Sequence, residues 1–320
     1  MKKVLSAIFC VILAIPVSAL ANTLPFKQVT IITHFPVGSG PDAMVRKISE
    51  TVTRLYNIPV VMENKPGGQG AIALAACNTA VNSVNNVNIC YADSAVVWAL
   101  PLITGKDEYT TNLKNLFTTN YADLGLIVSP DIKTLSDLKT AIKKTPNYGS
   151  WSVGSTGQVS SMELLKALNL KAEHIPYKDY SQWLIDVSTG RLAFSFATLG
   201  SSQPLIAAGK IKFIAIGTPA RDPEYPAIPT VNEFLGKNSG FIPIKAIGMY
   251  MVKKDMSVID QQALSTMFIT AMKEPVVKAD IASRLYRIWP YSQAETPMLL
   301  EKEERNYLRA IKEYNIEMKQ

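Results

Sequence analysis

The sequence has 320 residues, with 33 Lys and Arg against 26 Asp and Glu, and a formal net charge of +7. The basic residues are scattered or form short pairs such as Lys143-Lys144 and Lys253-Lys254, which argues against a nucleic-acid-binding stripe. No His, Cys, Asp or Glu cluster has metal-ligand spacing, and neither a G-x-S-x-G nor a Walker A motif occurs. Metalloenzyme and common hydrolase classes are therefore disfavoured.

The first residues are typical of a secretory signal peptide. Lys2 and Lys3 precede an apolar run over 4–17, and Ala19-Leu20-Ala21 matches an A-x-A cleavage pattern. The run is short for a membrane span, so we expect residues 1–21 to be removed by cleavage after Ala21. No later stretch is long and apolar enough to cross a bilayer, so we expect an exported, soluble mature protein.

After the signal peptide, predicted strands alternate with predicted helices. Strands are expected over 28–35, 58–62, 88–92, 191–200 and 210–218, with one more after residue 246. Helices are expected from Asp42 as N-cap, from near 71, over 160–168 and 181–188, and from Thr296 with Pro297 at its first position. Thr134 and Asp137 form a capping-box pattern before a further helix. The alternation predicts an α/β architecture with largely parallel sheets.

Cys77 and Cys90 are the two cysteines that remain after cleavage. An even pair in an exported protein favours a disulfide, which would stabilise the fold by about 3 kcal/mol. Two free buried thiols are the alternative, because sequence alone does not give the geometry of a disulfide.

Residues 38–43, GSGPDA, match the G-x-G-x-x-A fingerprint of dinucleotide-binding folds. They follow a predicted strand and open a predicted helix, and Glu63 ends the next strand where a ribose-binding acid is expected. However, 35–37 insert a kinked lead-in before the glycines, and Pro41 has no N–H to offer a pyrophosphate. An exported protein also meets little nicotinamide cofactor. An NAD-dependent oxidoreductase is therefore the minor alternative.

Five segments, in order, resemble the solute receptors of tripartite tricarboxylate transporters, also called Bug-type receptors. The segments are FPVGSGPDAMVRKI at 35–48, PVVMENKPGGQGAIA at 59–73, NYGSWSVGSTG at 147–157, HIPYKD at 174–179 and LIAAGKIKFIAIGTPARDPEYPAIPTVNE at 205–233. Each motif alone is weak, but together they cover essentially the whole mature chain at the family's spacing.

The resemblance implies a type II periplasmic-binding-protein-like fold, with two α/β domains on either side of a ligand cleft. Domain 1 is expected to comprise 22–122 and 247–320, and domain 2 to comprise 123–246, with crossings near 121–126 and 246–249. The implied function is a periplasmic, monomeric solute-binding protein that passes a small carboxylate to membrane transporter subunits. No catalysis, cofactor, metal or nucleic-acid partner is expected. A ligand sensor that feeds a signalling partner is the alternative.

In the family, Gly-rich loops of the first domain hold a ligand carboxylate, because glycine lets the backbone approach closely. A Ser-rich loop of the second domain meets the other end of the ligand through its hydroxyl groups. The residues expected to bind ligand by this resemblance are Phe35, Val37, Gly38, Ser39, Gly40, Gly67, Gly68, Gly70, Asp93, Ser94, Ser150, Trp151, Ser155, Thr156, Ala197 and Thr198.

Several of these positions have structural interpretations or depart from the family pattern. Asp42 is expected to be a helix cap, Arg46 to form a structural pair, and Asn64 with Glu63 to hold the Gly-rich loop. Ala197 replaces an acidic residue that pairs with the amine in amino-acid receptors, which argues against an amino-acid ligand. The 77–105 stretch is the most divergent and makes Asp93 and Ser94 weaker candidates. Trp151 is unusual and would suit an aromatic or apolar ligand body.

Overall fold

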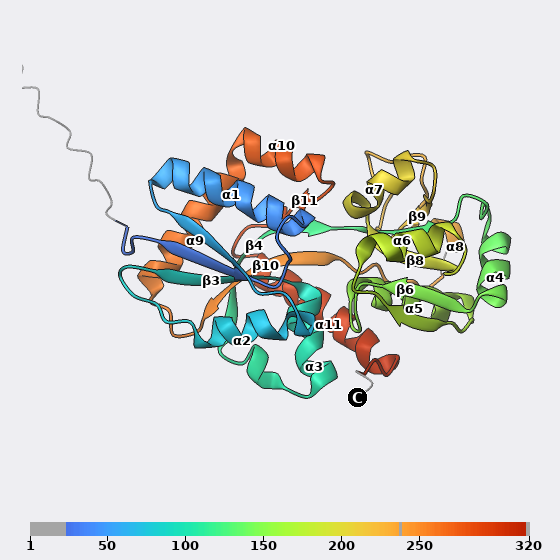
Figure 1. The fold of residues 1–320 in the computed structure, drawn as a ribbon, viewed down its shortest axis with the longest axis horizontal. Coiled ribbons are helices and arrows are strands. Elements are labelled where there is room, and N and C mark those ends of the chain that lie inside the picture. The colour runs from blue at the N-terminus through green and yellow to red at the C-terminus, as the bar shows by residue number, and fades with distance from the viewer. Residues whose placement is uncertain (1–23, 237–238, 318–320) are drawn as a thin grey trace, which may run out of the picture.

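Two mixed sheets, each flanked by helices, form two lobes that the chain joins at two crossings (Figure 1). The computed structural model describes residues 24–236 and 239–317. The predicted signal peptide, 1–21, and its cleavage point lie outside the described residues.

The sheet of the first lobe has the strand order β11-β4-β10-β3-β1-β2. Its three N-terminal strands are mutually parallel, whereas β10 runs antiparallel to both β3 and β4. The strand bounds are β1 Val29–Thr33, β2 Val60–Asn64, β3 Val87–Asp93, β4 Leu113–Ala122, β10 Ala246–Lys253 and β11 Arg287–Ile288.

The sheet of the second lobe has the strand order β7-β6-β8-β5-β9. The β6 strand is parallel to β7 and β8, whereas β5 is antiparallel to β8 and β9. The strand bounds are β5 Leu124–Val128, β6 Asn147–Ser150, β7 Glu173–Pro176, β8 Phe194–Thr198 and β9 Lys212–Ile216.

The prediction of largely parallel sheets is therefore wrong, since both sheets are mixed. The cause lies in the strands by which the chain enters or re-enters a lobe. The β5 strand enters the second lobe directly from β4, and β10 returns to the first lobe, so neither follows a helical crossover within its own sheet. Parallel pairing requires such a crossover, whereas antiparallel pairing does not.

Helices of the first lobe cover both faces of its sheet. One face carries α1 (Gly40–Tyr56), α9 (Val258–Lys273) and α10 (Pro275–Ser283), which share an apolar core with β1 and β3. The other face carries α2 (Ala71–Thr79), a π-helical turn with α3 (Leu100–Thr104), and the C-terminal α11 (Thr296–Glu313).

Helices of the second lobe likewise enclose its sheet between two apolar clusters. The bounds are α4 Leu135–Lys144, α5 Thr156–Leu168, α6 Tyr180–Ser188, α7 Leu199–Ala207 and α8 Val231–Leu235. The predicted capping box of α4 is confirmed, because the Thr134 hydroxyl accepts from the Asp137 N–H and the Asp137 carboxylate accepts from the Thr134 N–H.

The start of α1 differs from the prediction. The helix begins at Gly40 with Ser39 in the N-cap position, so Asp42 lies inside the first turn and is not the N-cap. Pro41 at the second helical position explains the earlier start, because a proline near the beginning of a helix costs no hydrogen bond.

The first crossing between the lobes is short. The β4 strand ends at Ala122, β5 begins at Leu124, and only Asp123 lies between them. The second crossing enters β10 at Ala246. The division of the chain into 22–122 plus 247–320 and 123–246 stays a prediction, and these short connections are where we would place its boundaries.

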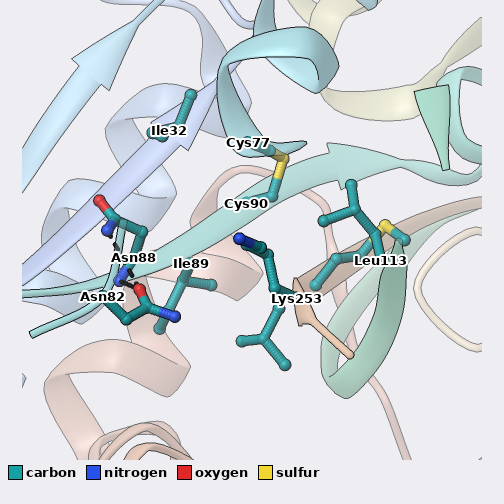
Figure 2. A pocket seen from close by; sticks show the side chains of 10 residues that line it. Ile32, Cys77, Asn82, Asn88, Ile89, Cys90, Leu113 and Lys253 are labelled. Atoms are coloured by element: carbon teal, nitrogen blue, oxygen red, sulfur yellow. Dashed lines mark hydrogen bonds between the residues drawn. A yellow bond between two sulfur atoms is a disulfide. The ribbon is translucent and has the colours of Figure 1, made fainter. Parts of the chain in front are cut away.

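Cys77 on α2 and Cys90 on β3 form a disulfide with an S–S distance of 2.02 Å, so a bond fixes this helix to the sheet (Figure 2). A small cavity of about 10 Å³ lies beside it, with Ile32, Asn88 and Lys253 in its wall. A shallower hollow of about 340 Å³ lies between α11 and the strands β4 and β10. Neither hollow is lined by a residue that was expected to bind ligand.

Candidate functional site

The strand order places both sets of predicted loops at equivalent points of the two sheets. In the first lobe, β2 and β3 lie on opposite sides of β1, so the order of connection reverses between β1 and β3. In the second lobe, β7 and β8 lie on opposite sides of β6 in the same way. Ligands of open α/β sheets bind beyond the carboxyl ends of the strands at such a reversal. A ligand-binding site is therefore expected at the loops after β1, β3, β6 and β8.

The loop after β1 is held by a buried carboxylate. Asp42 Oδ2 accepts from the Gly38 N–H at 2.8 Å and from Arg46 Nε at 2.9 Å, and Oδ1 accepts from Asn64 Nδ2 at 2.7 Å. Asn64 Nδ2 also donates to the Phe35 carbonyl at 2.9 Å. Burial pushes the pKa of Asp42 up, but the hydrogen bonds from Arg46, Asn64 and Gly38 outweigh it and hold that pKa below its ordinary value. The pairing expected of Arg46 is thus present.

This arrangement speaks against the dinucleotide interpretation. The Gly38 N–H, which the fingerprint would direct at a pyrophosphate, already donates to a carboxylate. A pyrophosphate there would lie beside the negative charge of Asp42 and would meet no N–H at Pro41. Glu63, the expected ribose ligand, pairs instead with Lys65 at 3.4 Å.

The remaining polar groups of this loop differ in accessibility. The Ser39 N–H and hydroxyl both donate to the Pro36 carbonyl, at 3.1 and 2.8 Å, and Val37 is 72% exposed. The Gly40 N–H, at the first position of α1, has no partner within the helix, because the first N–H groups of any helix lack one. The backbone of Gly40 is thus the natural anion donor of this segment.

The second Gly-rich loop makes a tight turn into α2. Gly67, Gly68 and Gly70 all have positive φ angles, of 112°, 54° and 97°, and the Gly70 N–H donates to the Gly67 carbonyl at 3.0 Å. A Cβ atom on Gly70 would lie 2.5 Å from the Val96 side chain. Glycine at this position is therefore required by both conformation and space.

The end of β3 places Asp93 beside the first loop. The β1 and β3 strands are parallel with Thr33 opposite Tyr91, so His34 and Phe35 continue alongside Ala92 and Asp93. Asp93 Oδ1 accepts from the Val96 N–H at 3.0 Å, and Oδ2 lies 3.8 Å from His34 Nε2.

Ser94 has a different role from the one expected. Its side chain is fully buried, donates to the Lys245 carbonyl at 3.3 Å and accepts from the Ile247 N–H at 3.2 Å. It therefore holds the second crossing in place against the end of β3.

In the second lobe, the hydroxyls after β6 form a closed network. Ser155, the N-cap of α5, donates to Ser150 Oγ at 2.8 Å, and Ser150 Oγ lies 2.7 Å from His174 Nε2. Ser150 is fully buried, and burial lowers the pKa of His174 to about 4, so this imidazole is neutral at pH 7. The Gln158 side chain accepts from the Gly154 N–H at 2.7 Å and fixes the turn. Thr156, the first residue of α5, is half-buried at the helix N-terminus.

An aromatic pair and a hydroxyl pair complete the second-lobe side. The Trp151 ring is 42% exposed, and its centroid lies 6.3 Å from that of Tyr180. Thr198, at the N-cap of α7, lies 2.5 Å from Ser201 through their hydroxyls, and Ser201 also meets the Tyr180 hydroxyl. Ala197 is buried in the core of the second lobe.

Two loops of the second lobe, those after β6 and β8, touch the first lobe. A Cβ atom on Gly200 at the start of α7 would lie 2.1 Å from the Arg284 carbonyl oxygen, and one on Gly154 would lie 3.1 Å from Ile103. The Tyr307 hydroxyl of α11 donates to the Gly154 carbonyl.

Ion pairs also cross between the lobes. Arg287 Nη2 lies 2.5 Å from Asp222 Oδ2, and Arg309 Nη2 lies 2.5 Å from Glu163 Oε1. The loops after β6 and β8 thus face the first lobe.

Sequence reasoning missed Tyr286, Tyr180 and His34. The Tyr286 hydroxyl lies 3.6 Å from the position of a Cβ on Gly40. Burial raises the pKa of Tyr286, and the neighbouring Tyr180 and Asp93 raise it further, so this phenol lies near charged or polar groups of both lobes. Tyr286 follows α10 in a turn where no motif marks it. His34 lies directly before the first motif, which begins at Phe35.

Among residues 24–236 and 239–317, no group of three or more His, Cys, Asp or Glu side chains is arranged to hold a metal ion. No helix in the described part of the chain is both long and apolar enough to cross a membrane.

Two α/β lobes, linked by two crossings and facing each other through Gly- and Ser-rich loops, define a protein with the type II periplasmic-binding-protein fold. Solved structures support this class. R. palustris Rpa4515 with adipate has a TM-score of 0.77 at 20% identity, covering 92% of this chain and 99% of that one. MatC from Rhodopseudomonas palustris with bound malate has a TM-score of 0.75 at 16% identity, covering 89% and 98%.

Sequence comparisons give the family. The model of the tripartite tricarboxylate transporter family receptor, TctC, matches residues 44–316. Protein BugT of Bordetella pertussis is 26% identical over 233 residues, which are 69% of each chain. The chain therefore belongs to the tripartite tricarboxylate transporter receptor family, a family of periplasmic solute-binding receptors, and the resemblance found in its motifs is confirmed.

Proposed function

We propose that this protein captures a small carboxylate between its two lobes and delivers it to the membrane subunits of a tripartite transporter. The observation that carries the proposal is the position of the loops. The loops after β1 and β3, and those after β6 and β8, occupy the reversal points of their sheets, and the second-lobe loops contact the first lobe at Gly154 and Gly200.

The proposed binding residues of the first lobe lie in its three loops. Anion binding there falls mainly to the Gly40 N–H at the start of α1, with Phe35, Val37, Gly38 and Ser39 shaping the loop. The turn of Gly67, Gly68 and Gly70 gives the backbone the close approach that a small anion needs.

The proposed binding residues of the second lobe are Trp151, Thr156 and Thr198, with Ser155 oriented by the network around Ser150. Ser94 and Ala197 support the site from behind. Adipate and malate, bound by two proteins of similar fold, are dicarboxylates and support a carboxylate as ligand class.

The mechanism is binding coupled to a change in the relative position of the lobes. A ligand that contacts both lobes stabilises the conformation in which they are close, and a membrane partner that recognises this conformation then receives the ligand. We further propose export to the periplasm with cleavage after Ala21, a monomeric state and no catalytic activity.

The test is a thermal-shift titration of the mature protein, from Asn22 onward, against carboxylates, the matching amides and NAD. A ligand present at a hundred times its dissociation constant stabilises the folded state by about 2.7 kcal/mol, which corresponds to a shift of a few degrees. We expect a shift with a carboxylate and none with its amide. A shift with NAD alone would refute the proposal.

A substitution at Trp151 tests the involvement of the second lobe. Trp151→Ala removes a half-exposed ring and should weaken ligand binding about tenfold or more. Tyr291→Ala removes a ring of similar exposure outside the loops and should leave binding unchanged. Equal affinity of both variants and the wild type would exclude Trp151 from the site.

A further inference from the structure

Asp93 is a carboxylate without a cationic partner. Its side chain is 26% exposed, and among the described residues no Lys or Arg nitrogen lies within 4 Å of it. The nearest basic group is His34, whose pKa is lowered by burial, the largest effect, against the opposing influence of Asp93. Burial thus disfavours the charged imidazolium form, and no Lys or Arg side chain in the described part of the chain contacts Asp93.

The negative charge of Asp93 acts on three tyrosines from separate elements, which are Tyr91 on β3, Tyr286 after α10 and Tyr307 on α11, and the His34 imidazole lies 3.8 Å from its carboxylate. Burial raises the pKa of each of the three phenols, and the negative charge of Asp93 adds to each shift. Phenols with raised pKa values stay neutral at pH 7, so these tyrosines supply no positive charge to balance Asp93.

His34 provides a second, independent indication of a missing group. It is 92% buried, yet its Nε2 atom has no hydrogen-bond partner among the described residues. A buried polar atom left unpaired costs free energy, and a ligand group that pairs with it would recover that cost. Nε2 lies 3.8 Å from Asp93 Oδ2, too far for a direct hydrogen bond but close enough for one ligand group to contact both.

The aromatic rings beside this pair favour a cation. The Phe35 ring packs against His34 at an interplanar angle of 35°, with centroids 4.0 Å apart, and lies 5.6 Å from the Tyr91 ring. Ring faces attract organic cations and exclude water, which strengthens the interaction of a cation with the carboxylate. A second carboxylate placed here, by contrast, would be repelled by Asp93.

Building on the carboxylate receptor proposed above, we propose that Asp93 binds a positively charged nitrogen of the ligand, with His34 beside it. The ligand class is then a carboxylate that also carries an ammonium group. The carboxylate would meet the backbone at Gly40, and the ammonium group would lie at the end of β3. Asp93 in the first lobe would thus pair with the ligand amine, which Ala197 in the second lobe cannot do.

Asp93→Asn is a sharp test because it changes the charge and keeps the shape. Asn retains a side-chain oxygen that can accept from the Val96 N–H, so the start of the π-helical turn is preserved. Asp131→Asn removes the same charge from an exposed turn of the second lobe and serves as the matched control.

Calorimetry gives the dissociation constants of the wild type and both variants for three pairs of acids, and the two acids of each pair differ by an amine group. The pairs are succinate and aspartate, glutarate and glutamate, and adipate and 2-aminoadipate. We expect at least one amine-bearing acid to bind ten times or more tightly than its partner. We expect Asp93→Asn to abolish that preference and Asp131→Asn to retain it.

The outcomes separate this proposal from the one on which it rests. The role of Asp93 is overturned if each amine-free acid binds the wild type as tightly as the matching amine-bearing acid. It is also overturned if the preference for the amine survives in Asp93→Asn. Either result leaves the proposed carboxylate receptor intact. If no acid of either kind binds the wild type, the carboxylate receptor itself is refuted, and the role of Asp93 with it.

Discussion

Replacing Asp42 by alanine should destabilise the protein more than any other single change in its loops. The side chain is 1% exposed and accepts hydrogen bonds from Gly38, Arg46 and Asn64 at 2.7–2.9 Å. A buried donor left without its acceptor costs about 1–3 kcal/mol. Arg46 is 40% exposed and can turn to water, but the Gly38 N–H and the Asn64 amide lose their acceptor.

A loss of this size is a large part of the roughly 5–15 kcal/mol that stabilises a typical folded protein. At about 2 °C for each kcal/mol, the two donors left by Asp42→Ala should together lower the Tm by about 4–12 °C in differential scanning calorimetry at pH 7. Asp137→Ala, which removes the exposed half of the α4 capping box, is the control and should lower Tm less. An Asp42→Ala protein that melts with the wild type would refute this account of the loop.

The dependence on pH gives a second readout of the same interaction. The pKa of Asp42 is lowered in the folded state, so its stabilising contribution is present above its ordinary pKa of 3.8 and is lost as the pH falls through the folded value. The gap in Tm between the wild type and Asp42→Ala should therefore close in acid. A gap that stays constant below pH 3.8 would mean that packing, and not charge, causes the loss.

Three further changes test other parts of the structure. The double substitution Cys77→Ala with Cys90→Ala removes a disulfide between residues 13 positions apart and should lower the free energy of unfolding by about 3 kcal/mol. A reductant should lower the Tm of the wild type but not that of the variant. A wild-type Tm that does not change on full reduction would contradict this. Burial raises the pKa of Asp123 to about 6, so its stabilising protonated form is lost as the pH rises through that value. Asp123→Asn should therefore raise the free energy of unfolding by up to about 3 kcal/mol at pH 8 and leave it unchanged at pH 3.8, as measured by urea unfolding. A gain in stability that does not depend on pH would exclude this cause. Gly70→Ala meets both a positive φ and a steric clash and should cost more than about 1 kcal/mol, whereas Gly209→Ala meets strain in open space and should cost less; equal losses would remove the steric argument.

The sequence predicts the elements of this fold better than their pairing. The helix after Thr134 and the strands around the Gly-rich loops follow from local patterns, because caps and hydrophobic periodicity act within a few residues. The direction of β5 and β10 depends instead on where the chain leaves and re-enters each lobe. No local pattern records that path, which is why mixed sheets were predicted as largely parallel.

The residues of the candidate site that depend on local sequence could likewise be predicted, whereas those that depend on distant parts of the chain could not. The glycines of the first lobe could be predicted because a positive φ and a close backbone approach demand that residue type. Tyr286 could not, because it approaches Gly40 only after some 240 residues of intervening chain have folded. The supporting role of Ser94 was also hidden, since its partners at the second crossing lie more than 150 residues away.

The place of β10 in the first sheet sets an order on folding. It hydrogen-bonds to β3 on one side and β4 on the other, so without residues 246–253 the N-terminal strands have a gap in the middle of their sheet. The strands of the second sheet, by contrast, all lie between residues 124 and 216. As the chain emerges from a ribosome or a translocation channel, the second lobe can close on itself first, and the first lobe has to wait for nearly the whole chain.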